Sequence, residues 1–208
     1  MLYSPNAVVY QLKITLRGIS PLIWRRLLVR ADTSIAELHH ILQLVMGWTN
    51  SHLHRFLIHG KEYGLAYDGG PGFAEDPRQS RLRDFQFRLH ERFLYEYDFG
   101  DNWQHDMRVE QIVAADRQCI YPICIGGKRA APPEECGGVE AYLAQWRHWK
   151  YNFLYRRLQA SSVDRAGDIF ADGEEEEEVN EPGYAPDHFD RRAVNAQLRR
   201  RAVRGGQP

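Results

Sequence analysis

A His-x-His pair and a nearby group of carboxylates are the residues whose types and spacing best suggest chemistry. The stretch "SHLHRFLIHG" holds two histidines separated by one residue, and "YDFGDNWQHD" holds two aspartates and a further histidine. Residues i and i+2 of a strand project from the same face, so two imidazoles can reach one metal ion. A carboxylate can join such a site or orient one of its imidazoles. The sequence therefore predicts a divalent metal site, with zinc as the example, at His52, His54, Asp98, Asp101 and His105.

Each of these residues also has an ordinary structural explanation. For His52 and His54 it is a strand end that carries two partly exposed, hydrogen-bonded histidines. Asp98 and Asp101 flank a glycine, which is typical of a tight turn. His105 alternates with Trp103 and Met107, and a histidine on an apolar strand face is more often a core residue than a ligand. Convergence of the five side chains in the fold decides between these two interpretations.

The three cysteines form a second candidate metal cluster. Cys119, Cys124 and Cys136 lie in one short segment, and three thiolates with a histidine can bind zinc. Their spacing does not match the short Cys pairs of a zinc ribbon or finger. An odd number of cysteines also argues against a disulfide framework. The alternative is that they are small buried residues of an irregular loop.

A basic run near the C-terminus is a candidate nucleic-acid contact. Phosphate oxygens attract clustered guanidinium groups, so such a run can bind DNA. It can equally pair with the acidic segment at 174–178 or increase the solubility of the terminus. The arginines concerned are Arg199, Arg200, Arg201 and Arg204.

Composition limits the class of protein. The chain has 208 residues, 43% of them hydrophobic, which suits a domain with one sizeable core. The net charge of −1 argues against a global basic field for nucleic acid. No apolar run approaches the roughly 20 residues of a membrane span, and the N-terminal residues lack a signal-peptide pattern. We therefore expect a cytoplasmic protein that makes no membrane contact.

Hydrophobic periodicity predicts the elements that position these residues. Residues 8–16 alternate strictly between apolar and polar types, which indicates a half-buried strand. A second strand follows within "LIWRRLLVRA", and the histidine segment indicates a third. Two further strands, "RFLYEYDF" and "NWQHDMRVEQI", meet at a turn signal of Gly100 and Asn102. Ser34 and Glu37 form a capping box at the start of a helix that Gly47 ends.

The remaining chain predicts less regular structure. Residues 119–138 carry several glycines and a Pro-Pro pair, so we expect no regular element there. A long helix is predicted over 139–158. The order of elements predicts an α+β fold, a mostly antiparallel, curved sheet packed against two main helices. We expect a core domain at 1–160, an acidic flexible segment at 161–183, and a short C-terminal helix with a basic tail at 184–208.

Several phrases together identify a family resemblance. They are "ISPLIWRRLLV", "LHHILQLVMGWTNSHLHRF", "YEYDFGDNWQHDM", "YPICIGGKRAAPPEECGG" and "FDRRAVNAQLR". In combination they resemble the plasmid pRiA4b ORF-3-like family, also described as insertion-element passenger or TnpR-like proteins, over about residues 8–200. The resemblance implies a small α+β fold with no established biochemical activity. A serine resolvase is not implied, since no serine of these motifs stands out as an activated nucleophile.

Three functions follow from these observations. The leading hypothesis is an accessory binding or interaction module of mobile elements, with DNA or a mobile-element protein as partner. The second is a metal-dependent hydrolase-like enzyme, in which the His and Asp cluster holds an ion that activates water. The third is a DNA-binding accessory protein that uses the arginine-rich end.

Overall fold

The fold is built from seven strands and three helices. The computed structural model describes residues 7–64, 76–163 and 184–204. The strands are β1 (Val8–Leu16), β2 (Trp24–Arg30), β3 (His54–Ile58), β4 (Lys61–Tyr63), β5 (Arg92–Tyr97), β6 (Trp103–Ala114) and β7 (Ile123–Lys128). The helices are α1 (Ile35–Met46), α2 (Gly138–Val163) and α3 (Arg191–Arg204), with a 3-10 turn, η1 (Leu82–Phe85).

All seven strands form one antiparallel sheet in the order β4-β3-β5-β6-β1-β2-β7. The pairing of β1 with β2 and of β5 with β6 follows from the short turns between them. Along β1 the side chains of Leu12, Ile14 and Leu16 are buried, while Gln11 and Lys13 are partly exposed. The sheet thus has an apolar face and a polar face, and the α+β class is confirmed.

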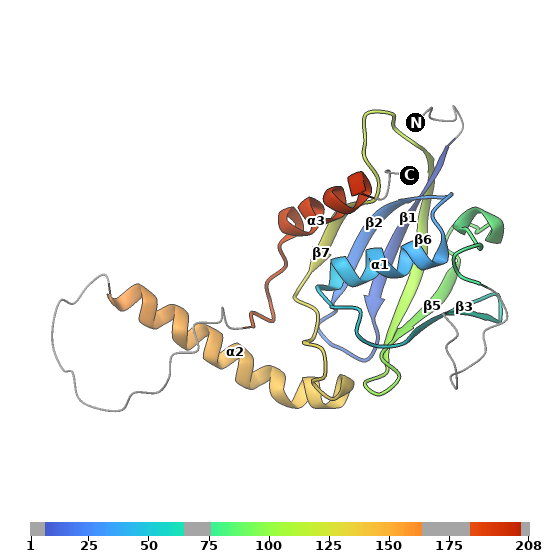
Figure 1. Ribbon diagram of the computed structural model, residues 1–208. Helices are drawn as coiled ribbons and strands as arrows, with labels where there is room; N and C mark the ends of the chain where they lie inside the picture. The colour runs from blue at the N-terminus through green and yellow to red at the C-terminus, as the bar shows by residue number, and fades with distance from the viewer. Residues whose placement is uncertain (1–6, 65–75, 164–183, 205–208) are drawn as a thin grey trace.

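Helix α1 covers the apolar face of the sheet (Figure 1). The predicted capping box is present, because the Ser34 side chain accepts from the Glu37 backbone and the Glu37 side chain accepts from the Ser34 backbone. Gly47 ends the helix with φ 80°, a left-handed conformation that glycine adopts without strain. The buried face of α1 includes Leu38 and Leu42, but also the polar side chain of His39.

Strand β7 corrects the prediction that residues 119–138 contain no regular element. Its two glycines do not mark a turn; they let aromatic rings approach the strand. A β-carbon on Gly127 would lie 2.3 Å from the Phe189 ring, and one on Gly126 would lie 3.3 Å from the Trp24 ring. A side chain at Gly127 would clash with the Phe189 ring, and one at Gly126 would require the Trp24 ring to shift by a few tenths of an ångström, so this packing explains the glycines in an otherwise extended segment.

Helix α2 is longer than the predicted range and extends away from the sheet in Figure 1. Tyr142 near its start is fully buried, whereas Leu143 and Leu154 are exposed, so only its first turns join the core. The expected acidic segment at 161–183 lies almost entirely outside the described residues. No helix in the described part of the chain combines the length and the apolar character that a bilayer crossing requires.

Candidate functional site

The sheet register places two of the three histidines on the face beneath α1. His54 pairs with Tyr97 of β5, and Tyr95 of β5 pairs with His105 of β6. Side chains of directly paired residues share one face, so these rings form a polar and aromatic layer between the sheet and α1. His52 precedes β3. Its ring lies near Tyr97 of β5, with centroids 5.9 Å apart, but its other neighbours, Asp98 and Glu135, belong to the loops at the end of the sheet.

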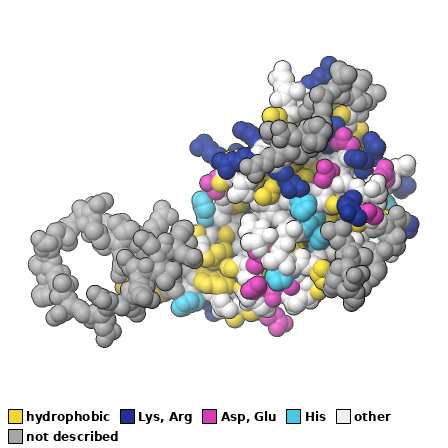
Figure 2. Space-filling view, viewed as in Figure 1, with side chains coloured by type: hydrophobic (Ala, Val, Ile, Leu, Met, Phe, Trp, Pro, Cys, Tyr) yellow, Lys and Arg dark blue, Asp and Glu magenta, His cyan; other side chains and the backbone are white. Residues whose placement is uncertain are grey.

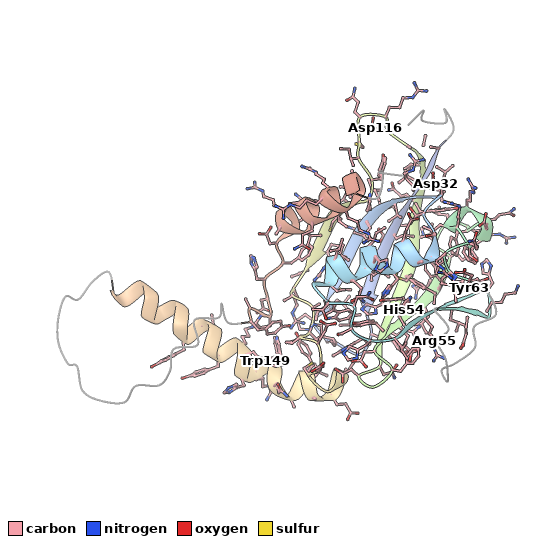
Figure 3. The ribbon with its side chains drawn as sticks, viewed as in Figure 1. Asp32, His54, Arg55, Tyr63, Asp116 and Trp149 are labelled. Atoms are coloured by element: carbon pink, nitrogen blue, oxygen red, sulfur yellow. The ribbon has the colours of Figure 1, made fainter. Side chains whose placement is uncertain are left out.

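Within this layer His54 stacks on His39 of α1. Their ring centroids are 3.4 Å apart and their planes 3° from parallel (Figure 3 labels His54). His39 Nδ1 lies 2.9 Å from the Tyr95 hydroxyl, and its Nε2 bonds to Asn50 Oδ1. Burial lowers the pKa of His39 to about 4 and that of His54 to about 3. Both imidazoles are therefore neutral at pH 7. The His39 ring is hydrogen-bonded in the core, whereas His54 Nε2 is buried with no hydrogen-bond partner among the described residues.

His105 is fully enclosed in the same layer. Its ring lies against Trp48, with centroids 5.4 Å apart, and against Tyr95, with centroids 5.3 Å apart. Burial is the main cause that lowers the pKa of His105 to about 4. The ring is therefore a neutral, fully buried group, and neither of its nitrogens has a hydrogen-bond partner among the described residues.

His52 and Asp98 are the pair that the structure brings together. His52 Nε2 lies 3.6 Å from Asp98 Oδ2 and 3.7 Å from Glu135 Oε1. Asp98 itself has φ 56°, and its Oδ1 accepts the Gly100 backbone N–H at 3.0 Å. Asp98 thus serves the turn through one oxygen and faces His52 through the other.

Asp101 ties the β5–β6 turn to the loop before α2. Its Oδ2 accepts the Gly137 backbone N–H at 3.2 Å. In the same loop Glu134 accepts the Tyr97 hydroxyl at 2.6 Å and the Thr49 backbone N–H at 2.8 Å. Three separate loops therefore meet at this end of the sheet, held by carboxylates that bond across them.

Sequence reasoning missed His39, Glu134 and Glu135 as members of this cluster. A signal for His39 exists, because it falls among the apolar positions of the helix where an unpaired polar group is unexpected. No local pattern marks the two glutamates, since their partners lie at least 37 residues away in sequence.

The five predicted ligands do not converge on one point. His54 is engaged by the His39 stack, His105 is enclosed, and Asp101 bonds to backbone. Among the residues that the structure describes, no group of three or more His, Cys, Asp or Glu side chains is arranged to hold a metal ion. A zinc ion at this site stays a prediction of the sequence.

The three cysteines lie in different surroundings, all as free thiols. Cys119 sits in a loop where its Sγ approaches Asp116 at 3.5 Å, and Cys124 is buried on β7. Cys136 is half-buried, and burial with the nearby Asp101 charge raises its pKa to about 11. Burial also raises the pKa of Cys119 and of Cys124, so all three favour the neutral thiol over the thiolate that ligates metal.

The predicted arginine run lies on α3, which packs firmly on the sheet edge. Leu198 is fully buried, and Asn195 bonds to both the backbone N–H and the C=O of Cys124, at 2.8 and 2.9 Å. Arg199, Arg200 and Arg201 are exposed on this helix, while the Arg204 side chain lies outside the described residues. Figure 2 shows basic side chains gathered around α3 in this view.

Comparison with known proteins gives the family. The model of the plasmid pRiA4b ORF-3-like protein family matches residues 8–193. Uncharacterized protein y4hQ of Sinorhizobium fredii is 36% identical over 137 residues, which cover 65% of this chain and 70% of that protein. A crystal structure of MM3350 from Methanosarcina mazei Go1, a protein of unknown function, is 34% identical with a TM-score of 0.68 and matches over 91% of this chain and 97% of its own. This chain belongs to the plasmid pRiA4b ORF-3-like family.

Proposed function

We propose that the chain is an accessory binding module of mobile elements and that it contacts an anionic partner through α3. The observation that carries this proposal is the run of three consecutive exposed arginines at 199–201 on a firmly held helix. Within the described residues none of the three lies in ion-pair distance of a carboxylate. Exposed cations without an internal partner attract anionic surfaces and are available to bind them.

The same helix carries a second pair of cations. Together with Arg199, these two arginines, Arg191 and Arg192, line a hollow of about 360 Å³ over strand β7. Arg191 donates to the Ile125 carbonyl at 3.0 Å, which fixes its position on the sheet edge. The mobile-element part of the proposal rests on the family, whose name refers to a plasmid reading frame.

The test is retention on a heparin column at increasing salt. The triple variant R199A/R200A/R201A should elute at clearly lower salt than the native chain, because fewer cations contact the polyanion. The matched control is R88A/R92A/R147A, which removes three exposed arginines elsewhere on the surface and should elute nearly as the native chain does. Circular dichroism checks that both variants keep their helix content. Equal elution of the two variants would contradict the proposal, since total charge alone would then explain retention.

The metal-dependent hydrolase ranks behind the binding module. Of the predicted ligands, His52 and Asp98 lie close together, with 3.6 Å between His52 Nε2 and Asp98 Oδ2, and Glu135 lies 3.7 Å from the same nitrogen. His54 and His105, which that hypothesis needs as ligands, are buried and neutral in the core. The arginine surface therefore supports a function better than the histidine cluster does.

A further inference from the structure

A groove of about 730 Å³ lies between α1 and α3, next to the arginine run. Its apolar lining comes from Ile41 and Leu44 of α1 and from Tyr121 and Pro122 of the loop before β7. Arg200 and Arg201 line the groove from α3. Its volume falls within the range of roughly 300–1,000 Å³ that is typical of ligand pockets.

The carboxylates of this groove are already engaged within the protein. Asp32 accepts two hydrogen bonds from Arg30, at 2.8 and 2.7 Å (Figure 3 labels Asp32). Glu37 is occupied by the capping box of α1. Arg200 and Arg201 have no carboxylate partner among the described residues, so their two positive charges are available to pair with an anionic ligand.

Charge and apolar surface lie side by side in this groove. Leu44 is partly buried and follows Ile41 by three residues on the same helix; because Ile41 is only 4% exposed, Leu44 supplies most of the apolar surface that α1 offers to the groove. The arginines stand on the facing helix. A ligand seated here meets apolar side chains on one flank and guanidinium groups on the other.

We infer that this groove receives a peptide segment of a partner protein that carries acidic side chains next to apolar ones. The inference rests on the proposed function and names the kind of partner that the arginine surface selects. Apolar stripes in grooves between helices commonly receive peptide segments, and guanidinium groups pair well with carboxylates. Duplex DNA fits this groove less well, since the apolar wall of Leu44, Tyr121 and Pro122 offers its phosphates no partner.

The test measures fluorescence anisotropy of three labelled probes with the full chain. The first probe is a short amphipathic peptide of glutamate and leucine, the second replaces every leucine by serine, and the third is duplex DNA. The glutamate–leucine peptide should bind tightest, because only this probe matches both flanks of the groove. Its affinity should fall roughly tenfold in R200A/R201A, the factor that a loss of about 1.4 kcal/mol gives.

The variant L44Q separates the inference from the proposed function. It keeps the length of the side chain and the helix propensity of Leu44 but removes its apolar surface. The glutamate–leucine peptide should bind several-fold more weakly to L44Q, while retention on heparin stays unchanged. If heparin retention depends on the α3 arginines but the peptide does not bind, the proposed function stands and this inference fails. If duplex DNA binds tightest and L44Q has no effect, the occupant is nucleic acid and the inference is overturned.

Discussion

His39 of α1 and His54 of β3 stack with their rings nearly parallel, 3.4 Å between centroids. Two protonated imidazoles at this separation would repel each other in a medium of low dielectric constant. Besides burial, His40 and Arg201 lower the pKa of His39, and His39 and His40 lower the pKa of His54. The packing of α1 on this part of the sheet therefore depends on both imidazoles staying neutral.

The first prediction is that acid destabilises the fold through these histidines. The folded-state pKa values of about 4, 3 and 4 for His39, His54 and His105 lie below the usual value of 6.5. As pH falls, the unfolded chain therefore binds protons before the folded chain does. The contribution of these histidines to the free energy of unfolding is fully present above pH 6.5 and decreases from there toward pH 4. Each such histidine contributes a slope of up to about 1.4 kcal/mol per pH unit. Urea unfolding at pH 7 and pH 5 measures the loss.

The variant H105F tests how much of this pH dependence of the free energy of unfolding comes from His105. H105F keeps an aromatic ring beside Trp48 and Tyr95 but removes a titrating group, so its stability should fall less steeply between pH 7 and pH 5. The control M107L alters a neighbouring core residue of β6 that does not titrate, so it should change stability equally at both pH values. Identical slopes for the native chain and H105F would refute the assignment.

The second prediction concerns Arg25, whose side chain is 1% exposed. Its Nε donates to the Val45 carbonyl in the last turn of α1 at 2.8 Å, and its guanidinium lies 3.9 Å from the centre of the Phe189 ring. Desolvation lowers the pKa of Arg25 to about 10, so it is still charged at pH 7. R25M should reduce the free energy of unfolding by about 2–3 kcal/mol, because it leaves buried carbonyls without their donor.

The neighbouring Arg26 is a matched control for this substitution. It points to the other face of the sheet and pairs with Glu110 at 2.5 Å, with 31% of its side chain exposed. R26M should cost no more than about 1 kcal/mol, the usual range for partly exposed ion pairs. Urea titrations of both variants compare the two arginines, and equal losses would contradict a special role of Arg25 in holding α1.

Local patterns were sufficient to predict most of the elements. Three signals depend only on residues that are close in sequence. They are the strict alternation in β1, the capping box at Ser34 and the glycine after α1. Strand β7 was missed because Gly126 and Gly127 are typical of turns when read alone. Glycine is favoured at these positions because the Trp24 ring packs on Gly126 and the Phe189 ring on Gly127. Each ring lies more than 60 positions away in sequence from the glycine that it contacts.

The candidate site was less predictable than the fold because its contacts join distant segments. The two-residue spacing of His52 and His54 suggested a shared site, but β3 begins only at His54 and the two imidazoles have different neighbours. The stack on His39 depends on how α1 crosses the sheet, and no short-range pattern reports that. The arginine run on α3 was visible in sequence as a cluster of charge, while the groove beside it required the fold.

The third prediction concerns Glu134, which joins the loop before α2 to two other segments. It accepts hydrogen bonds from the Tyr97 hydroxyl and from the Thr49 backbone N–H, at 2.6 and 2.8 Å. E134A should lower the free energy of unfolding by about 1–3 kcal/mol, since both donors lose a charged acceptor. E134Q should restore part of the loss, because its amide oxygen still accepts a hydrogen bond.

The adjacent glutamate serves as the control for this loop. The Glu135 side chain is 77% exposed, and its Oε1 lies 3.7 Å from His52 Nε2. E135A should therefore change stability by no more than about 0.5 kcal/mol, as for other surface substitutions. Urea unfolding of the three variants at pH 7 checks the ranking, and an E135A loss as large as that of E134A would show that the loop responds to charge rather than to the Tyr97 bond.

The last prediction concerns the contact between Gly127 of β7 and Phe189. A β-carbon at this position would lie 2.3 Å from the ring, so G127A must displace Phe189 from its place over Arg25. We expect G127A to reduce the free energy of unfolding by about 1–3 kcal/mol, the usual cost of overpacking. In the background of F189A the same substitution should be neutral or stabilising by about 0.5 kcal/mol, because alanine loses less chain entropy than glycine in a strand. Urea unfolding of the two single variants and the double variant gives this coupling. Equal losses from G127A in both backgrounds would mean that the ring is not the cause.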